Sequence, residues 1–99
     1  MDGPWNVARV TADGLIFQGP VVYHGGTLRA TGGGAATVDV YDGTSTLDAL
    51  RDAFSAAASA IDPNAFDAGL RFERGLFIDL GANVDLFVVY WSLPESPSP

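Results

Sequence analysis

The sequence of 99 residues contains no cysteine and no lysine, and His24 is its single histidine. Without cysteine the chain cannot form disulfides or thiolate metal sites, and with one histidine it cannot form a zinc site of the HExxH type. Five arginines stand against 12 acidic residues, for a formal net charge of −7. Because nucleic acids are bound chiefly through arginine and lysine, this balance predicts no nucleic-acid partner.

Long hydrophobic runs are also missing. The longest strongly apolar run is Leu86–Trp91, which is too short to cross a hydrocarbon layer of about 30 Å. The amino terminus lacks the basic patch and apolar segment of a secretion signal. We therefore expect no membrane insertion, and synthesis in the cytoplasm without a signal peptide.

Glycine and proline interrupt the chain every 6 to 12 residues, and the runs between them are rich in Val, Ile, Thr, Tyr and Phe. This spacing is typical of antiparallel sandwiches. It predicts a mainly β fold, a single antiparallel β-sandwich of jelly-roll type over residues 1–93, followed by a Pro/Ser-rich tail over 94–99. The expected strands are Val7–Thr11, Leu15–Gln18, Val21–His24, Thr27–Thr31, Ala36–Tyr41, Leu70–Glu73, Leu76–Leu80 and Val84–Trp91.

One segment departs from this rhythm. Residues 46–60 are rich in alanine, and Leu47, Leu50 and Phe54 recur at helical spacing. Ser45 or Thr46 could cap the start of a helix there. The pattern predicts a short helix across one end of the sandwich, with a strand and loop as the alternative.

The last expected strand is apolar on both faces from Leu86 onward. Since an antiparallel sheet normally turns one face to water, two apolar faces indicate subunit association, with a central core strand as the alternative. The interface residues expected on this basis are Phe87, Val89, Trp91 and Leu93. The predicted partners are further copies of the chain and other proteins of the same assembly.

The residues that carry chemistry are sparse. His24 sits where a strand enters a turn, and no serine lies in a Gly-x-Ser-x-Gly elbow. Four carboxylates, those of Asp39, Asp42, Asp79 and Asp85, lie in or beside expected strands but lack the spacing of a calcium loop. We therefore expect no catalytic residue, no metal site and no cofactor, and we interpret these charges as solvated strand edges.

Aromatic residues offer a different function. Small β-sandwiches can bind sugars by stacking them on aromatic rings, and Trp5, Tyr41 and Trp91 are the candidates for such a glycan platform. A carbohydrate-binding module, with a host-surface glycan as ligand, is therefore the alternative to a structural role.

Four segments together resemble a group of short proteins encoded among the structural genes of tailed bacteriophages and related gene-transfer particles. They are GPVVYHG (19–25), YDGTS (41–45), GLFIDLG (75–81) and the valine-rich strand 84–90. The resemblance spans residues 14–91 and differs over 47–60, where those proteins have a strand and a short loop.

This resemblance implies a compact β-sandwich without enzymatic activity, located in a virion or phage-like particle. Such a protein would decorate the head, form the base of a head spike or fibre, or associate with the tail, with the capsid as its expected partner. It also implies that His24 is a framework residue.

Overall fold

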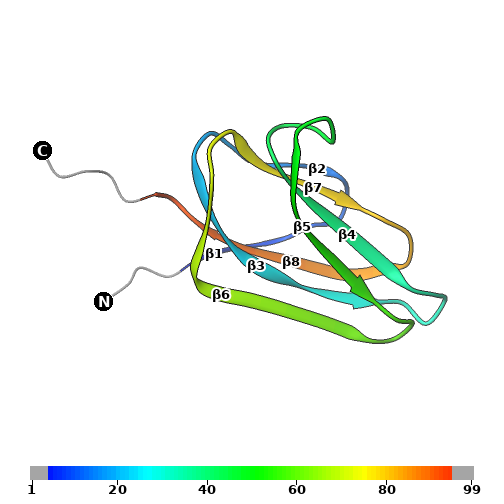
Figure 1. Ribbon diagram of the computed structural model, residues 1–99. Coiled ribbons are helices and arrows are strands. Elements are labelled where there is room, and N and C mark those ends of the chain that lie inside the picture. Colours follow the sequence, from blue (N-terminus) through cyan, green and yellow to red (C-terminus); the bar gives the residue numbers. More distant parts are fainter. Residues whose placement is uncertain (1–4, 95–99) are drawn as a thin grey trace, which may run out of the picture.

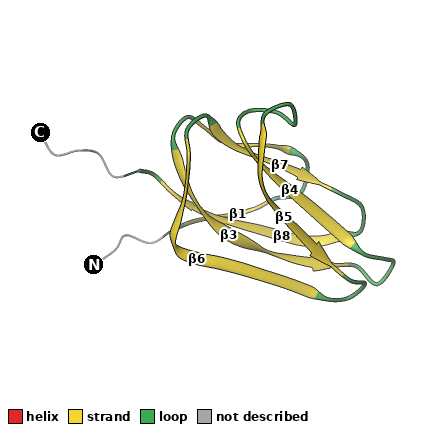
Figure 2. Ribbon diagram, in the orientation of Figure 1, coloured by secondary structure: helices red, strands yellow, loops and turns green. Residues whose placement is uncertain are grey.

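The computed structural model describes residues 5–94, apart from the side chains of residues 66–68. This part of the chain folds into eight strands in two layers, with no helix (Figure 1, Figure 2). The strands are β1 (Asn6–Arg9), β2 (Gly14–Gln18), β3 (Val21–Ala30), β4 (Ala36–Asp42), β5 (Ala49–Ala56), β6 (Ile61–Phe72), β7 (Gly75–Leu80) and β8 (Val84–Ser92). The expected residues 95–99 of the tail lie outside the described residues.

The two sheets have the strand orders β1-β8-β3-β6 and β2-β7-β4-β5, and we call them sheet A and sheet B. All neighbouring strands are antiparallel. Two four-stranded sheets with this order are the arrangement of a jelly roll, so the predicted fold class is confirmed. Within residues 5–94 no helix is long and apolar enough to span a membrane.

The predicted helix over 46–60 is wrong. Residues 49–56 form β5, which pairs with β4 from Ala36↔Ala56 to Asp42↔Ala49. The strand places Phe54 in the core, where it meets Phe87 edge-on with ring centroids 5.1 Å apart. The ladder and this burial outweigh the helical propensity of the alanines, because propensity is a weak term.

The sequence also predicts a break at Gly25-Gly26, but both glycines lie inside the ten-residue strand β3. A Cβ on Gly26 would stand 2.5 Å from the carbonyl oxygen of Val88, and Gly25 has φ of +97° next to a β-bulge. Both glycines therefore serve a close approach of neighbouring strands, which is the other use of glycine in a sheet.

The core lies between the sheets and is formed by inward-facing residues of strands β3 to β8, together with Val10 after β1. Its members are Val10, Val21, Tyr23, Leu28, Ala30, Ala36, Val38, Val40, Phe54, Ala56, Phe72, Leu76, Ile78, Phe87 and Val89. A polar contact also crosses the interior, since the Tyr23 hydroxyl in sheet A donates to Asp52 Oδ2 in sheet B at 2.8 Å. Burial, followed by this hydrogen bond and the Asp52 charge, raises the pKa of Tyr23 far above its usual range.

Candidate interaction surface

The residues predicted for a subunit interface do not share one surface. Phe87 and Val89 have 0% of their surface exposed and belong to the core, so the prediction of an interface there is wrong. The reason is that this face of β8 points between the sheets. Trp91 is half-buried, with its ring 5.2 Å from that of Phe17 in sheet B. Of the four predicted residues, Leu93 is exposed.

The predicted glycan platform is not assembled either. Trp5 stacks on His24 with ring centroids 4.2 Å apart, on the side of sheet A. Trp91 turns inward from the same sheet, whereas Tyr41 belongs to β4 of sheet B. The three rings therefore cannot contact a single sugar together.

His24 forms a hydrogen-bonded pair with Ser92, which the sequence does not predict. Its Nε2 lies 2.9 Å from the Ser92 hydroxyl at the end of β8. A serine beside a histidine can make a nucleophile and base. Here the imidazole is almost fully buried and covered by the Trp5 ring. His24 therefore links β3 to the end of β8 and to the segment before β1. This placement is that of a framework residue.

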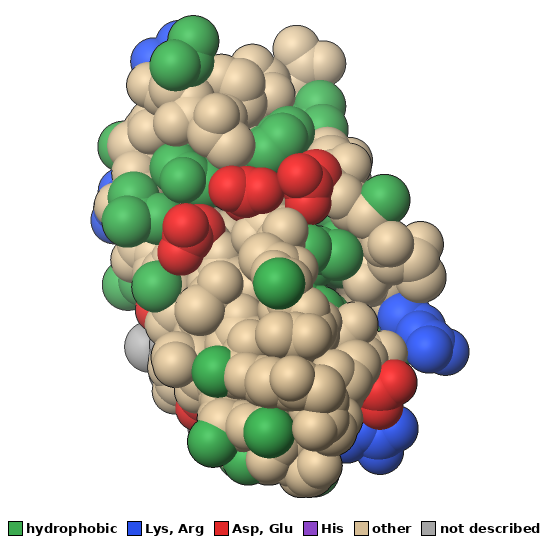
Figure 3. Space-filling view, turned by 90° about the vertical axis from the view of Figure 1, so that its right-hand side faces the viewer, with side chains coloured by type: hydrophobic (Ala, Val, Ile, Leu, Met, Phe, Trp, Pro, Cys, Tyr) green, Lys and Arg blue, Asp and Glu red, His purple; other side chains and the backbone are tan. Residues whose placement is uncertain are grey.

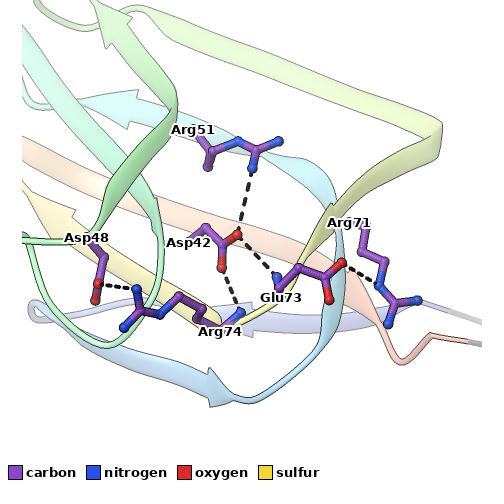
Figure 4. Close-up of polar contacts among 6 residues, drawn as sticks. All are labelled: Asp42, Asp48, Arg51, Arg71, Glu73 and Arg74. Atoms are coloured by element: carbon purple, nitrogen blue, oxygen red, sulfur yellow. Dashed lines mark hydrogen bonds and ion pairs between the residues drawn. The ribbon is translucent and has the colours of Figure 1, made fainter.

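Asp42 and His24 are the two buried polar or charged residues in the part of the chain that the structure describes, and Asp42 has 8% of its surface exposed. Its carboxylate accepts hydrogen bonds from the backbone N–H groups of Glu73 at 3.2 Å and Arg74 at 2.9 Å, and Arg51 approaches to 3.7 Å (Figure 4). The carboxylate thereby ties the end of β4 to the turn between β6 and β7.

The residues after Asp42 complete this structure. Asp48 Oδ2 accepts a hydrogen bond from the Thr44 N–H at 2.8 Å. Its other oxygen lies 3.5 Å from Arg74 Nη1 (Figure 4). The Gly43 N–H donates to the Gly75 carbonyl at 3.1 Å. The DGTS segment (residues 42–45), Asp48 and Gly75, which opens β7, thus form one hydrogen-bonded unit, which we call the latch. Its polar groups stabilise the turns after β4 and before β7. We assign it an architectural role.

The outer face of sheet B is different, because it carries a row of apolar side chains. The register places Leu15 opposite Phe77, Phe77 opposite Tyr41, and Tyr41 opposite Leu50, so the row crosses all four strands. Leu15 is 41% and Leu50 56% exposed, and the two rings between them are half-buried. The rings meet edge-on with centroids 6.4 Å apart.

A row of carboxylates borders these apolar side chains. Asp39 and Asp79 are direct cross-strand partners, and Asp13 joins them from the loop before β2 by accepting a hydrogen bond from the Leu80 N–H. Burial, then the hydrogen bond and charge of Asp13, and then the charge of Asp39 raise the pKa of Asp79. Figure 3 shows acidic side chains in a row with hydrophobic ones beside them. We call both rows together the acidic face.

The outer face of sheet A carries two arginines beside its apolar side chains. Leu86 and Val88 point outward from β8, since Phe87 between them is buried. Arg9 of β1 is the cross-strand partner of Val88, and Arg29 of β3 that of Leu86. Exposed apolar side chains stand at both edges, Val7 of β1 (64%) and Ile61 of β6 (56%). We call this set, Val7, Arg9, Arg29, Ile61, Leu86 and Val88, the arginine face.

Sequence reasoning missed both faces, although part of the signal is visible. The alternation of β4 places Asp39 and Tyr41 on one side of their strand. Which strands lie beside β4, and so bring Phe77 and Asp79 next to these residues, depends on the jelly-roll order. The inward and outward faces of β8 read alike in the sequence, because both are apolar.

No cluster of three or more metal-ligating side chains is placed to hold an ion among the described residues. The carboxylates of the acidic face are thus not arranged as a metal centre. In comparisons with known proteins, no protein-family model, no curated protein and no solved structure matches the chain.

Proposed function

We propose that this protein is a non-enzymatic structural component of a phage or phage-like particle, which assembles through the outer faces of its two sheets. The observation that carries the proposal is the presence of exposed apolar side chains across both outer faces. Such surfaces mark sites of protein association, because isolated domains seldom leave contiguous apolar area in water.

The energetics favour association at these faces. Burying a leucine, isoleucine or valine side chain completely is worth about 1.5–3 kcal/mol. Leu15 and Leu50 on one face, and Val7 and Ile61 on the other, have about half of that gain still available. A partner that covers either face gains this remaining burial free energy, which the folded chain by itself does not.

The architecture and the sequence resemblance support the same proposal. Jelly rolls occur in viral capsid proteins, in lectins and in cupins, so the fold alone does not choose a function. The segments that resemble phage structural proteins, YDGTS and GLFIDLG, meet in the latch around Asp42 and Gly75. In this protein they stabilise turns, as a structural component requires.

The proposal is tested on particles purified by density gradient from cultures of the organism that encodes the chain. We expect peptides of the protein to co-sediment with the particle peak at a constant ratio to the major capsid protein. Immunogold labelling should then distinguish head from tail. Absence of the protein from purified particles, while it is present in the cell lysate, would refute the proposal.

Carbohydrate binding is the second candidate, and it rests on Tyr41. The ring lies half-exposed on the acidic face beside Phe77, with Asp39 and Asp79 as acceptors for sugar hydroxyl groups. A glycan array probed with the labelled protein tests it, with Tyr41→Ala as the variant that should lose binding. Trp5→Ala is the matched control, since Trp5 packs against the other sheet. An array without signal would eliminate this candidate.

A further inference from the structure

We propose that copies of this chain stack head to tail, the acidic face of one copy docking on the arginine face of the next. This inference rests on the proposed function and adds the partner and the mode of assembly. It follows from the composition of the two faces, which are on opposite sides of the same sandwich.

The acidic face cannot pair with a copy of itself at low cost. A two-fold interface centred on the carboxylate row would bring Asp39 and Asp79 of both copies together, and these two side chains already stand opposite each other within one chain. Like charges in apposition cost several kcal/mol at an interface. The fitting partner is an apolar surface that carries positive charge.

The arginine face has this composition. Leu86 and Val88 form an apolar strip along β8, and the guanidinium groups of Arg9 and Arg29 flank it from the two neighbouring strands. Apolar residues of this face can cover the row from Leu15 to Leu50. The arginines can then reach the carboxylates that border that row.

The existing ion pair of Arg29 does not prevent this contact. Arg29 Nη2 lies 2.7 Å from Asp85 Oδ2, but the two side chains remain 50% and 43% exposed. A guanidinium carries five N–H donors, and an exposed pair of this kind contributes about 0–1 kcal/mol. Arg29 can therefore add a carboxylate from a neighbouring copy at little cost.

The position of the faces determines the type of assembly. An interface between two different surfaces of the same chain is heterologous, and it repeats until the copies close into a ring or continue as a filament. Each added copy presents a new acidic face at one end and a new arginine face at the other. This gives a small structural protein a way to be present in many copies.

The first test is sedimentation velocity of the wild-type protein over a range of concentrations at 0.01 M and 1 M salt. We expect a concentration-dependent series of oligomers at low salt and a shift toward monomer at high salt, because the Debye length falls from about 30 Å to about 3 Å. A monomer at all concentrations and both salt levels would overturn the inference.

Charge reversal then identifies the surfaces. The pair Asp39→Arg and Asp79→Arg makes the acidic face basic, and the pair Arg9→Glu and Arg29→Glu makes the arginine face acidic. Each double variant alone should associate at least about tenfold more weakly. An equimolar mixture should recover association, since every face then finds its complement. Glu73→Arg, at an exposed turn, is the control and should associate like the wild type.

Recovery in the mixture requires both variants to be folded, which circular dichroism and thermal melting verify beforehand. If a reversed pair fails to fold, Asp39→Asn with Asp79→Asn and Arg9→Gln with Arg29→Gln replace it, and each should weaken association. Folded variants that keep wild-type association, or a folded mixture that does not recover it, would overturn the stacking. A monomer found in purified particles would refute stacking and leave the proposed function standing, while stacks absent from particles would do the reverse.

Discussion

Replacing Asp42 by alanine should lower the free energy of unfolding by about 2–4 kcal/mol. The carboxylate accepts two backbone hydrogen bonds and faces Arg51, in a position that is nine-tenths buried. Hydrogen bonds to a charged group contribute about 1.5–3 kcal/mol each. Water that enters the vacated space recovers part of their sum, which gives the stated range.

The effect is large for a chain of this size. Domains of 60–100 residues lose about 4–8 °C in Tm per kcal/mol, so the variant should melt at least about 8 °C below the wild type. Urea unfolding followed by tryptophan fluorescence measures the free energy directly, and its slope reports whether the unfolded state has changed.

Two variants complete this experiment. Asp42→Asn keeps one acceptor oxygen and should cost less than Asp42→Ala. Glu73→Gln changes an exposed carboxylate next to the latch, whose pair with Arg71 is solvated, and should stay within about 0.5 kcal/mol of the wild type. A loss below about 1 kcal/mol in Asp42→Ala would show that the contacts of the Asp42 carboxylate do not stabilise the fold.

Three further predictions concern the interior and the acidic face. Tyr23→Phe leaves Asp52 without the hydroxyl donor and should cost about 1–3 kcal/mol in urea unfolding; a neutral result would mean that water replaces the donor. Gly26→Ala should lower Tm clearly, because its Cβ would press on the Val88 carbonyl, and an unchanged Tm would contradict the close approach of β3 and β8. Asp79→Asn should stabilise the monomer at pH 7 by about 0.2–1 kcal/mol, since like charges oppose each other across the strands. The raised pKa of Asp79 means that its proton favours the folded state, so the advantage of Asp79→Asn should shrink as the pH falls toward 4; an advantage that grows on acidification would refute this sign.

The local pattern was sufficient where turn residues bound a short run of strand-forming residues. The alternation from Ala36 to Tyr41 predicts β4 and its inward residues, and β2, β7 and β8 are found within one or two residues of their expected ends. It failed where the signal depends on neighbours. The alanines of residues 49–56 favour a helix locally, but the ladder with β4 makes this segment a strand. Gly25-Gly26 is typical of a turn, but in the fold Gly26 lies inside β3, where the Val88 carbonyl approaches it closely.

The sequence by itself determined the β class, the sandwich and the absence of thiolate or two-histidine chemistry, because alternation and composition are local properties of the chain. Tertiary structure alone decided that Phe87 and Val89 point inward while Leu86 and Val88 point outward, since both sets are equally apolar. It also decided which strands became neighbours, and hence that carboxylates from three separate segments share one face while arginines border the other. Which strands become neighbours depends on contacts between distant segments, and a short stretch of sequence contains no information about those contacts.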